Sequence, residues 1–162
     1  VLVSLRSNLN PESEMFRGAG LLHDDGRIEM QRLAEIPEED SEYYIVIEHR
    51  NHLPIMSPVP IPIVQGEILY DFASRDSYRS IIGTGQLNID GTFVMLAGNG
   101  EMALDYSSDT DINIKDLTAW LFNNGENSSY YLEDYDLNGD INIKDRILWE
   151  KNNGSFSPIK TK

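Results

Sequence analysis

The C-terminal third of the chain contains an internal repeat, and this repeat constrains the fold most strongly. Residues 105–116 match residues 134–145 at an offset of 29 residues. The match continues, because Trp120 aligns with Trp149 and the tripeptide Asn-Asn-Gly follows each Trp at the same distance. Two copies of one supersecondary unit explain a match of this length, whereas chance does not.

Each copy begins with a twelve-residue segment rich in oxygen-bearing side chains. Calcium takes six to eight oxygen ligands at flexible distances, and oxygens on alternate residues of a tight loop wrap around one ion. In the second copy, Gly139 permits the sharp turn and Asp140 offers its backbone carbonyl. The oxygen-bearing side chains at the first, third, fifth, ninth and twelfth places are Asp134, Asp136, Asn138, Asn142 and Asp145. The pattern predicts one Ca²⁺ ion per loop, two in all.

Two alternatives stay open for these loops. Segments rich in Asp, Asn and Gly also form plain turns and helix caps. Magnesium is disfavoured, because it keeps several waters and uses few protein ligands. At the eighth place, Ile112 and Ile141 are expected to pair the two loops through a short β-bridge.

The two loops are not equivalent. Ser107 stands where the second loop has Asp136, and a neutral hydroxyl is a weaker calcium ligand. Thr110 stands where the second loop has Gly139, and a β-branched residue resists the positive φ that Gly adopts freely. We therefore predict tighter calcium binding by the second loop.

A helix is expected after each loop, over residues 115–122 and 144–151. Leu117, Trp120 and Leu121 fall on one face of the first, and Leu148 with Trp149 on one face of the second. Asn-Asn-Gly supplies the stop signal for both helices. We expect the two apolar faces to pack on each other, with the Trp side chains in the core; a sugar-binding platform is the alternative.

Residues 1–100 have the pattern of an all-β unit of about seven short strands. The strand 43–49 should place Tyr43, Ile45 and Ile47 on one face, with the residues between them on the other. The other expected strands cover residues 1–6, 68–72 and 80–83. Two hairpins are expected over residues 16–30 and 86–96, and each has a turn that contains Gly. The proline-rich segment 53–63 suits an edge or a connector. Together they favour an Ig-like or transthyretin-like β-sandwich.

One tetrapeptide of this unit is a candidate chemical site. His49-Arg50-Asn51-His52 could bind a metal or transfer protons, although structural hydrogen bonding is the simplest interpretation. On a regular strand His49 and His52 would face opposite sides, and only a bulge or turn would realign them. No other catalytic motif accompanies them, so we expect a protein that is not an enzyme.

The composition of the chain excludes several classes of function. The chain has 162 residues, a formal net charge of −14 and no cysteine. The acidity argues against nucleic acid as a partner, and no apolar run is long enough to span a membrane. Every Lys lies after residue 100, which favours two domains, residues 1–100 and 101–162. Because a strand pattern begins at residue 1, the chain is expected to be a fragment of a longer polypeptide.

The repeated pattern D-x-[DNS]-x-[DN]-x-D-I-N-x-x-D, followed each time by one helix, resembles a dockerin. Dockerins carry two EF-hand-type calcium loop–helix repeats and attach secreted proteins to cohesin domains. The resemblance covers residues 105–156 and implies a dockerin-like pair of loop–helix repeats. With the β-sandwich expected before it, the expected fold is mainly β plus small α. It implies two sets of calcium ligands: Asp105, Ser107, Asp109, Asp111 and Asp116, and Asp134, Asp136, Asn138, Asp140 and Asp145.

The same resemblance implies a partner-binding surface. Recognition in dockerins depends on the tenth and eleventh loop places, which are Ile114-Lys115 and Ile143-Lys144 here. Because the two pairs are identical, two symmetry-related docking modes would be permitted. The partner would be a cohesin-like protein or another assembly subunit. Small hydroxyl residues, common at these places in cellulosomal dockerins, are absent.

The first unit resembles a β-module near the C-termini of large secreted proteins of Bacteroidetes-type bacteria, through residues 1–6, 20–26 and 43–53. This resemblance implies a secreted or cell-surface protein. The expected function is a non-enzymatic calcium-binding module for protein attachment. The alternative is a calcium-dependent carbohydrate-binding or adhesion module that uses aromatic side chains such as Tyr70, Tyr78, Tyr130 and Tyr131.

Overall fold

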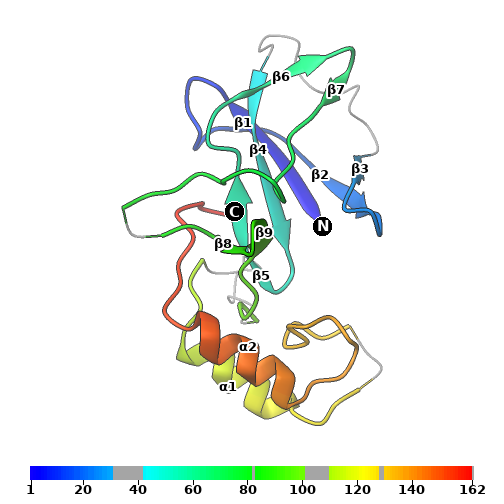
Figure 1. Cartoon of the computed structure of the whole chain (residues 1–162), viewed down its shortest axis with the longest axis vertical. Helices are drawn as coiled ribbons and strands as arrows, with labels where there is room; N and C mark the ends of the chain where they lie inside the picture. The colour runs from blue at the N-terminus through cyan, green and yellow to red at the C-terminus, as the bar shows by residue number, and fades with distance from the viewer. Residues whose placement is uncertain (31–41, 82, 101–109, 128–129, 162) are drawn as a thin grey trace.

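The computed structural model describes residues 1–30, 42–81, 83–100, 110–127 and 130–161. Within these ranges the protein is mainly β with two short helices, as expected (Figure 1). The elements are β1 Leu2–Ser7, β2 Glu14–Leu22, β3 Ile28–Met30, β4 Glu42–His49, β5 His52–Met56, β6 Ile61–Val64, β7 Glu67–Ile68, β8 Gln86–Ile89, β9 Thr92–Met95, α1 Ile114–Asn123 and α2 Ile143–Asn152. None of the described helices is long and apolar enough to cross a membrane.

Seven strands form one antiparallel sheet. Their order is β3-β2-β1-β4-β6-β7, and β5 pairs with β4 as a branch from this path. The remaining strands, β8 and β9, pair as a separate hairpin. Along β4 the alternation predicted from the sequence is confirmed. Tyr43, Ile45 and Ile47 lie in one apolar cluster, whereas Val46 lies in another with Met56 and Ile159.

Two hairpins were predicted correctly, because their turns depend on local sequence. Asp90 and Gly91 both have positive φ, +50° and +92°, as a two-residue hairpin turn requires. Gly26, in the turn before β3, has φ +85°. Glycine adopts such angles without steric cost, and Asp tolerates them better than most residues.

Three strand predictions need correction. Residues 68–72 were expected to be a strand, but β7 ends at Ile68 and Asp71 accepts the Ala73 N–H in a turn. Residues 80–83 were expected to be a strand, but among the described residues of this segment Ser80 and Gly83 form an isolated bridge with each other, and Ile82 lies outside the described residues. The proline-rich segment holds the branch strand β5, as expected of an edge, but β6 pairs with both β4 and β7.

The two units predicted from composition share a core. Leu53, Leu96 and Ala97 of the β unit pack in one buried cluster with residues of the helical unit, namely Ile112, Trp120, Tyr135, Ile141 and Trp149. After α2 the chain returns to the sheet, where Ile159 packs on Val46 and Met56 (Figure 1). The helical end of the molecule is thus anchored at two places.

The helices lie beside each other and exchange reciprocal hydrogen bonds. Trp120 Nε1 donates to the Asn142 carbonyl, and Trp149 Nε1 donates to the Asn113 carbonyl. Both indoles are buried, which confirms the core interpretation. Leu121 was predicted on the buried face, but it is 60% exposed.

The predicted bridge between Ile112 and Ile141 is wrong. The Ile112 N–H donates to Ser155 and its carbonyl accepts from Gly154, both after α2. Ile141 pairs in the same way with Glu126 and Gly125, which follow α1. Each loop therefore pairs with the segment after the helix of the other repeat, so the two repeats are interlocked.

Candidate metal site

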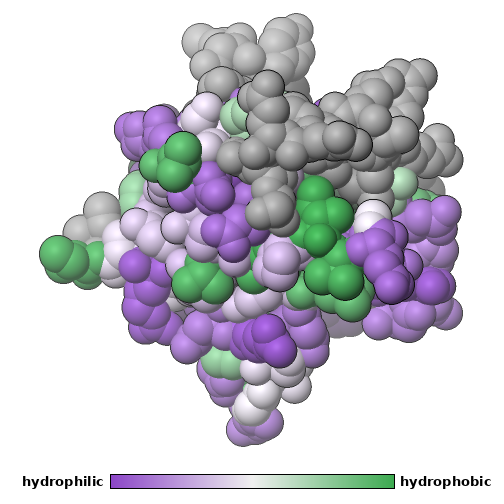
Figure 2. Space-filling model, turned by 90° about the horizontal axis from the view of Figure 1, so that it is seen from above, coloured by the Kyte–Doolittle hydropathy of each residue, from purple (hydrophilic) through white to green (hydrophobic). Residues whose placement is uncertain are grey.

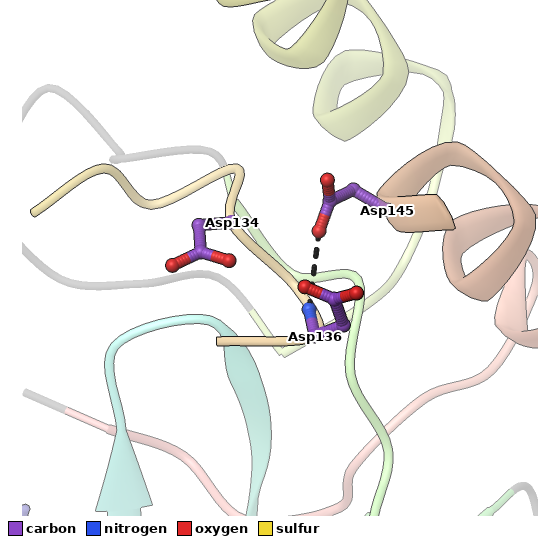
Figure 3. A group of neighbouring side chains, drawn as sticks. All are labelled: Asp134, Asp136 and Asp145. Atoms are coloured by element: carbon purple, nitrogen blue, oxygen red, sulfur yellow. Dashed lines mark hydrogen bonds between the residues drawn. The ribbon is translucent and has the colours of Figure 1, made fainter. Parts of the chain in front are cut away.

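The second loop brings three carboxylates together. Ligand oxygens of Asp134, Asp136 and Asp145 all lie within 4.8 Å of one another. Asp134 and Asp136 come from the loop and Asp145 from the first turn of α2 (Figure 3). Carboxylates at this separation repel one another, and a cation bound among them would offset that repulsion.

Backbone donors fix the position of Asp134 at the start of the loop. Its two carboxylate oxygens accept the N–H groups of Asn138 and Gly139 at 3.0 and 3.1 Å. The chain turns sharply enough to do this because Gly139 has φ +90°, which agrees with the turn predicted there. Asp134 is almost completely buried, with 2% of its surface exposed.

Asp145 has two roles in the structure. As the third residue of α2 it accepts the Asn142 N–H at 2.8 Å, while the Asn142 side chain accepts from Lys144, so the pair forms a capping box. Its other oxygen accepts the N–H groups of Tyr135 and Asp136. Burial raises the pKa of the Asp145 carboxyl above its usual range, and the Asp136 charge adds to this. A bound cation would relieve this cost.

Two predicted ligands of this loop lie outside the three-carboxylate group. The Asn138 amide donates to Asp136 Oδ2, and its oxygen accepts the Asp140 N–H. The Asp140 carbonyl accepts from Asn142 Nδ2 at 3.2 Å. Both Asn138 and Asp140 are exposed, so solvent reaches this side of the loop.

For the first loop, Asp105, Ser107 and Asp109 lie outside the described residues. Asp116 is completely buried and accepts the N–H groups of Gly100 and Asn113, each at 2.8 Å. It therefore has the same capping position as Asp145. Asp111 is exposed and accepts from the Asn113 amide.

The predicted partner-binding residues begin the two helices. Ile114 is 64% exposed and Ile143 57%, and the lysines that follow them are exposed too. Both pairs are therefore accessible for contact. At the opposite end of the molecule, hydrophobic side chains are interspersed with hydrophilic ones (Figure 2).

The sequence did not predict that the β unit reaches the second loop. The turn between β4 and β5 places Arg50 3.4 Å from Asp134 Oδ2, and its guanidinium lies 3.7 Å from the centre of the Tyr130 ring. Asn51, completely buried, donates from Nδ2 to the Asp134 backbone carbonyl. The His-Arg-Asn-His motif was visible as a candidate, but nothing local connects it to a loop more than 80 residues away.

The aromatic residues considered for carbohydrate binding are placed differently from one another. Tyr70 packs edge-on against Phe72 and donates its hydroxyl to the Asp76 carbonyl. Tyr130 is 80% exposed, although Arg50 lies over its ring. These side chains already have partners within the chain.

Comparison with protein-family models, curated proteins and solved structures found no match to the chain. Function therefore has to be inferred from the residues of the site.

Proposed function

We propose that the chain is a non-enzymatic calcium-binding module in which Ca²⁺ stabilises the fold. The observation that carries this proposal is the convergence of Asp134, Asp136 and Asp145 at one end of α2. Calcium is a hard cation that prefers carboxylate and carbonyl oxygens, and solvent at the exposed side of the loop can complete its coordination shell. The same chemistry in the first loop would make two ions per chain.

Calcium binding should be coupled to folding. In the unfolded chain nothing holds Asp145 beside Asp134 and Asp136, so an ion that binds all three together stabilises the folded state. The ion would offset both the mutual repulsion and the burial of Asp145.

Thermal melting in calcium and in EDTA tests this proposal. We expect calcium to raise the melting temperature of the wild-type chain and of Asp76→Ala, whose Asp is exposed and belongs to neither loop. Asp145→Ala should lose most of the increase. An equal melting temperature in calcium and in EDTA would refute a structural role for calcium.

The wider role we propose is protein attachment by a secreted or cell-surface protein. The fold would be a sandwich-like β module followed by a dockerin-like pair of repeats. The accessible Ile114-Lys115 and Ile143-Lys144 pairs support docking to a cohesin-like partner. With purified cohesin domains, binding should require calcium and should survive Ile114→Asp or Ile143→Asp alone but not the double variant. Binding that the double variant leaves unchanged would exclude this surface.

A further inference from the structure

The β4–β5 hairpin brings three donor atoms into a small triangle outside the calcium loops. His49 and His52 are register partners across the turn, so both rings lie on the same side. Their Nδ1 atoms are 3.0 Å apart, and Asn51 Oδ1 lies 2.9 Å from the first and 2.8 Å from the second. The turn has thus realigned two side chains that a regular strand would separate.

The orientation of Asn51 follows from its other contact. Its Nδ2 donates to the Asp134 carbonyl, an atom that can only accept. The amide oxygen therefore faces the two imidazoles. Because Asn51 is completely buried, it is held in this position.

Hydrogen bonds among the three atoms of this triangle cannot all be well formed. A neutral imidazole has one N–H and one lone pair. If both Nδ1 atoms carry hydrogen, two hydrogens crowd against one oxygen and against each other. If either does not, its lone pair faces the lone pairs of Asn51 Oδ1. A cation at the same point would accept a lone pair from all three atoms.

Solvent can complete the coordination shell at this triangle. His49 and His52 are each half-buried, so water reaches the rings and can supply further ligands.

We propose that His49 Nδ1, His52 Nδ1 and Asn51 Oδ1 bind a divalent transition-metal ion of the Zn²⁺ class. Ligands about 2.1 Å from such an ion are about 3.0 Å apart in octahedral coordination and about 3.4 Å apart in tetrahedral coordination. The triangle, with sides of 2.8, 2.9 and 3.0 Å, matches octahedral positions and reaches tetrahedral ones after a small outward shift of the rings. Imidazole ligands suit zinc, copper and nickel, whereas calcium prefers the oxygen ligands of the loop. The site is therefore chemically distinct from the proposed calcium site.

Calorimetry with zinc alone, on the full chain saturated with calcium, tests this site. We expect one zinc ion per wild-type chain. His49→Gln and His52→Gln should each weaken binding at least about tenfold. The matched control is His23→Gln, because His23 is the remaining histidine of the chain, lies 3.2 Å from Glu29 and is outside the triangle. The control should bind zinc like the wild type.

A second measurement does not depend on whether a variant folds. In the wild-type chain, ¹⁵N NMR of the histidine rings should show zinc shifting Nδ1 of His49 and His52 while His23 stays unchanged. Absence of zinc binding, a shift confined to His23, or unchanged affinity in His49→Gln and His52→Gln would overturn the proposal.

Discussion

The two loop–helix repeats make the same contacts in the core but carry different side chains on the surface. Asn113 with Asp116 and Asn142 with Asp145 form the same capping box, and each Trp donates to the carbonyl of the other N-cap residue. On the surface, α1 exposes Leu121 and Phe122, whereas α2 carries an Arg146–Glu150 ion pair at 2.9 Å. Capping and packing therefore preserve the repeat, and residues without such roles have diverged.

The second repeat also has a contact that no described residue of the first repeat makes. The β4–β5 turn reaches it, where Asn51 and Arg50 contact Asp134. In the first repeat, Asp116 instead accepts the N–H of Gly100, in the chain that leads from the β unit. The sheet is thus tied directly to the proposed calcium loop of the second repeat.

The largest effect should come from the two Trp residues and should be nearly equal in both repeats. Trp120→Ala and Trp149→Ala each remove a buried indole from the shared core, which costs about 3–5 kcal/mol. Urea unfolding measures this directly. A loss below about 1 kcal/mol in one variant alone would show that the reciprocal contacts are not equivalent.

Acid should destabilise the folded chain through His52, whose ring contacts Asn51 beside the second repeat. The pKa of His52 is about 3 in the folded chain and about 6.5 when unfolded, so the unfolded state binds more protons as the pH falls. The contribution of neutral His52 to the free energy of unfolding is therefore present above pH 6.5 and is lost as the pH falls. The loss is about 2 kcal/mol between pH 7 and pH 5. Urea unfolding of the wild type against His52→Gln measures it. The same pH dependence in both proteins would contradict this origin.

The two helix caps should contribute less to stability than the Trp residues or His52, and by equal amounts. Asn113→Ala and Asn142→Ala each remove a side chain that accepts from the helix backbone, at a cost of about 1 kcal/mol. Chemical unfolding in EDTA keeps metal binding out of the comparison. A cost confined to one variant would show that the two capping boxes differ in solution.

The smallest effect is expected where the repeats differ most. Leu121→Ser and Phe122→Ser replace side chains that are 60% and 84% exposed, so stability should change by less than about 0.5 kcal/mol. Thermal melting is sufficient to check this. A loss above about 1 kcal/mol would mean that these side chains are packed against other residues.

The features predicted from the sequence are those set by neighbouring residues. The helices expected over residues 115–122 and 144–151 are observed as Ile114–Asn123 and Ile143–Asn152. These helices, the turn at Asp90-Gly91 and the sharp turn at Gly139 follow from local chemistry. Tyr70 and Phe72 favour a strand, but Asp71 closes a local turn and prevents it. Strand propensity was therefore a weaker signal than the turn chemistry of one Asp.

The features that could not be predicted depend on distant residues. The pairing of Ile112 with the chain after α2 is set by how the helices pack, and so is the exposure of Leu121. The contact between Asn51 and Asp134 joins residues 83 positions apart. For the candidate site, the repeat indicated the three carboxylates but not the hairpin beside them.

Calorimetric titration with calcium tests the central proposal most directly. The second loop has Asp136 where the first has Ser107, and Gly139 at its turn where the first has Thr110. Asp145→Ala should therefore lower the overall calcium affinity more than Asp116→Ala. Asp76→Ala should bind like the wild type. Because Asp116 and Asp145 cap equivalent helices, loss of a cap alone would affect both variants equally. Binding of calcium by the wild type, with the larger loss in Asp145→Ala, is the predicted result; absence of calcium binding, or a larger loss in Asp116→Ala, would contradict it.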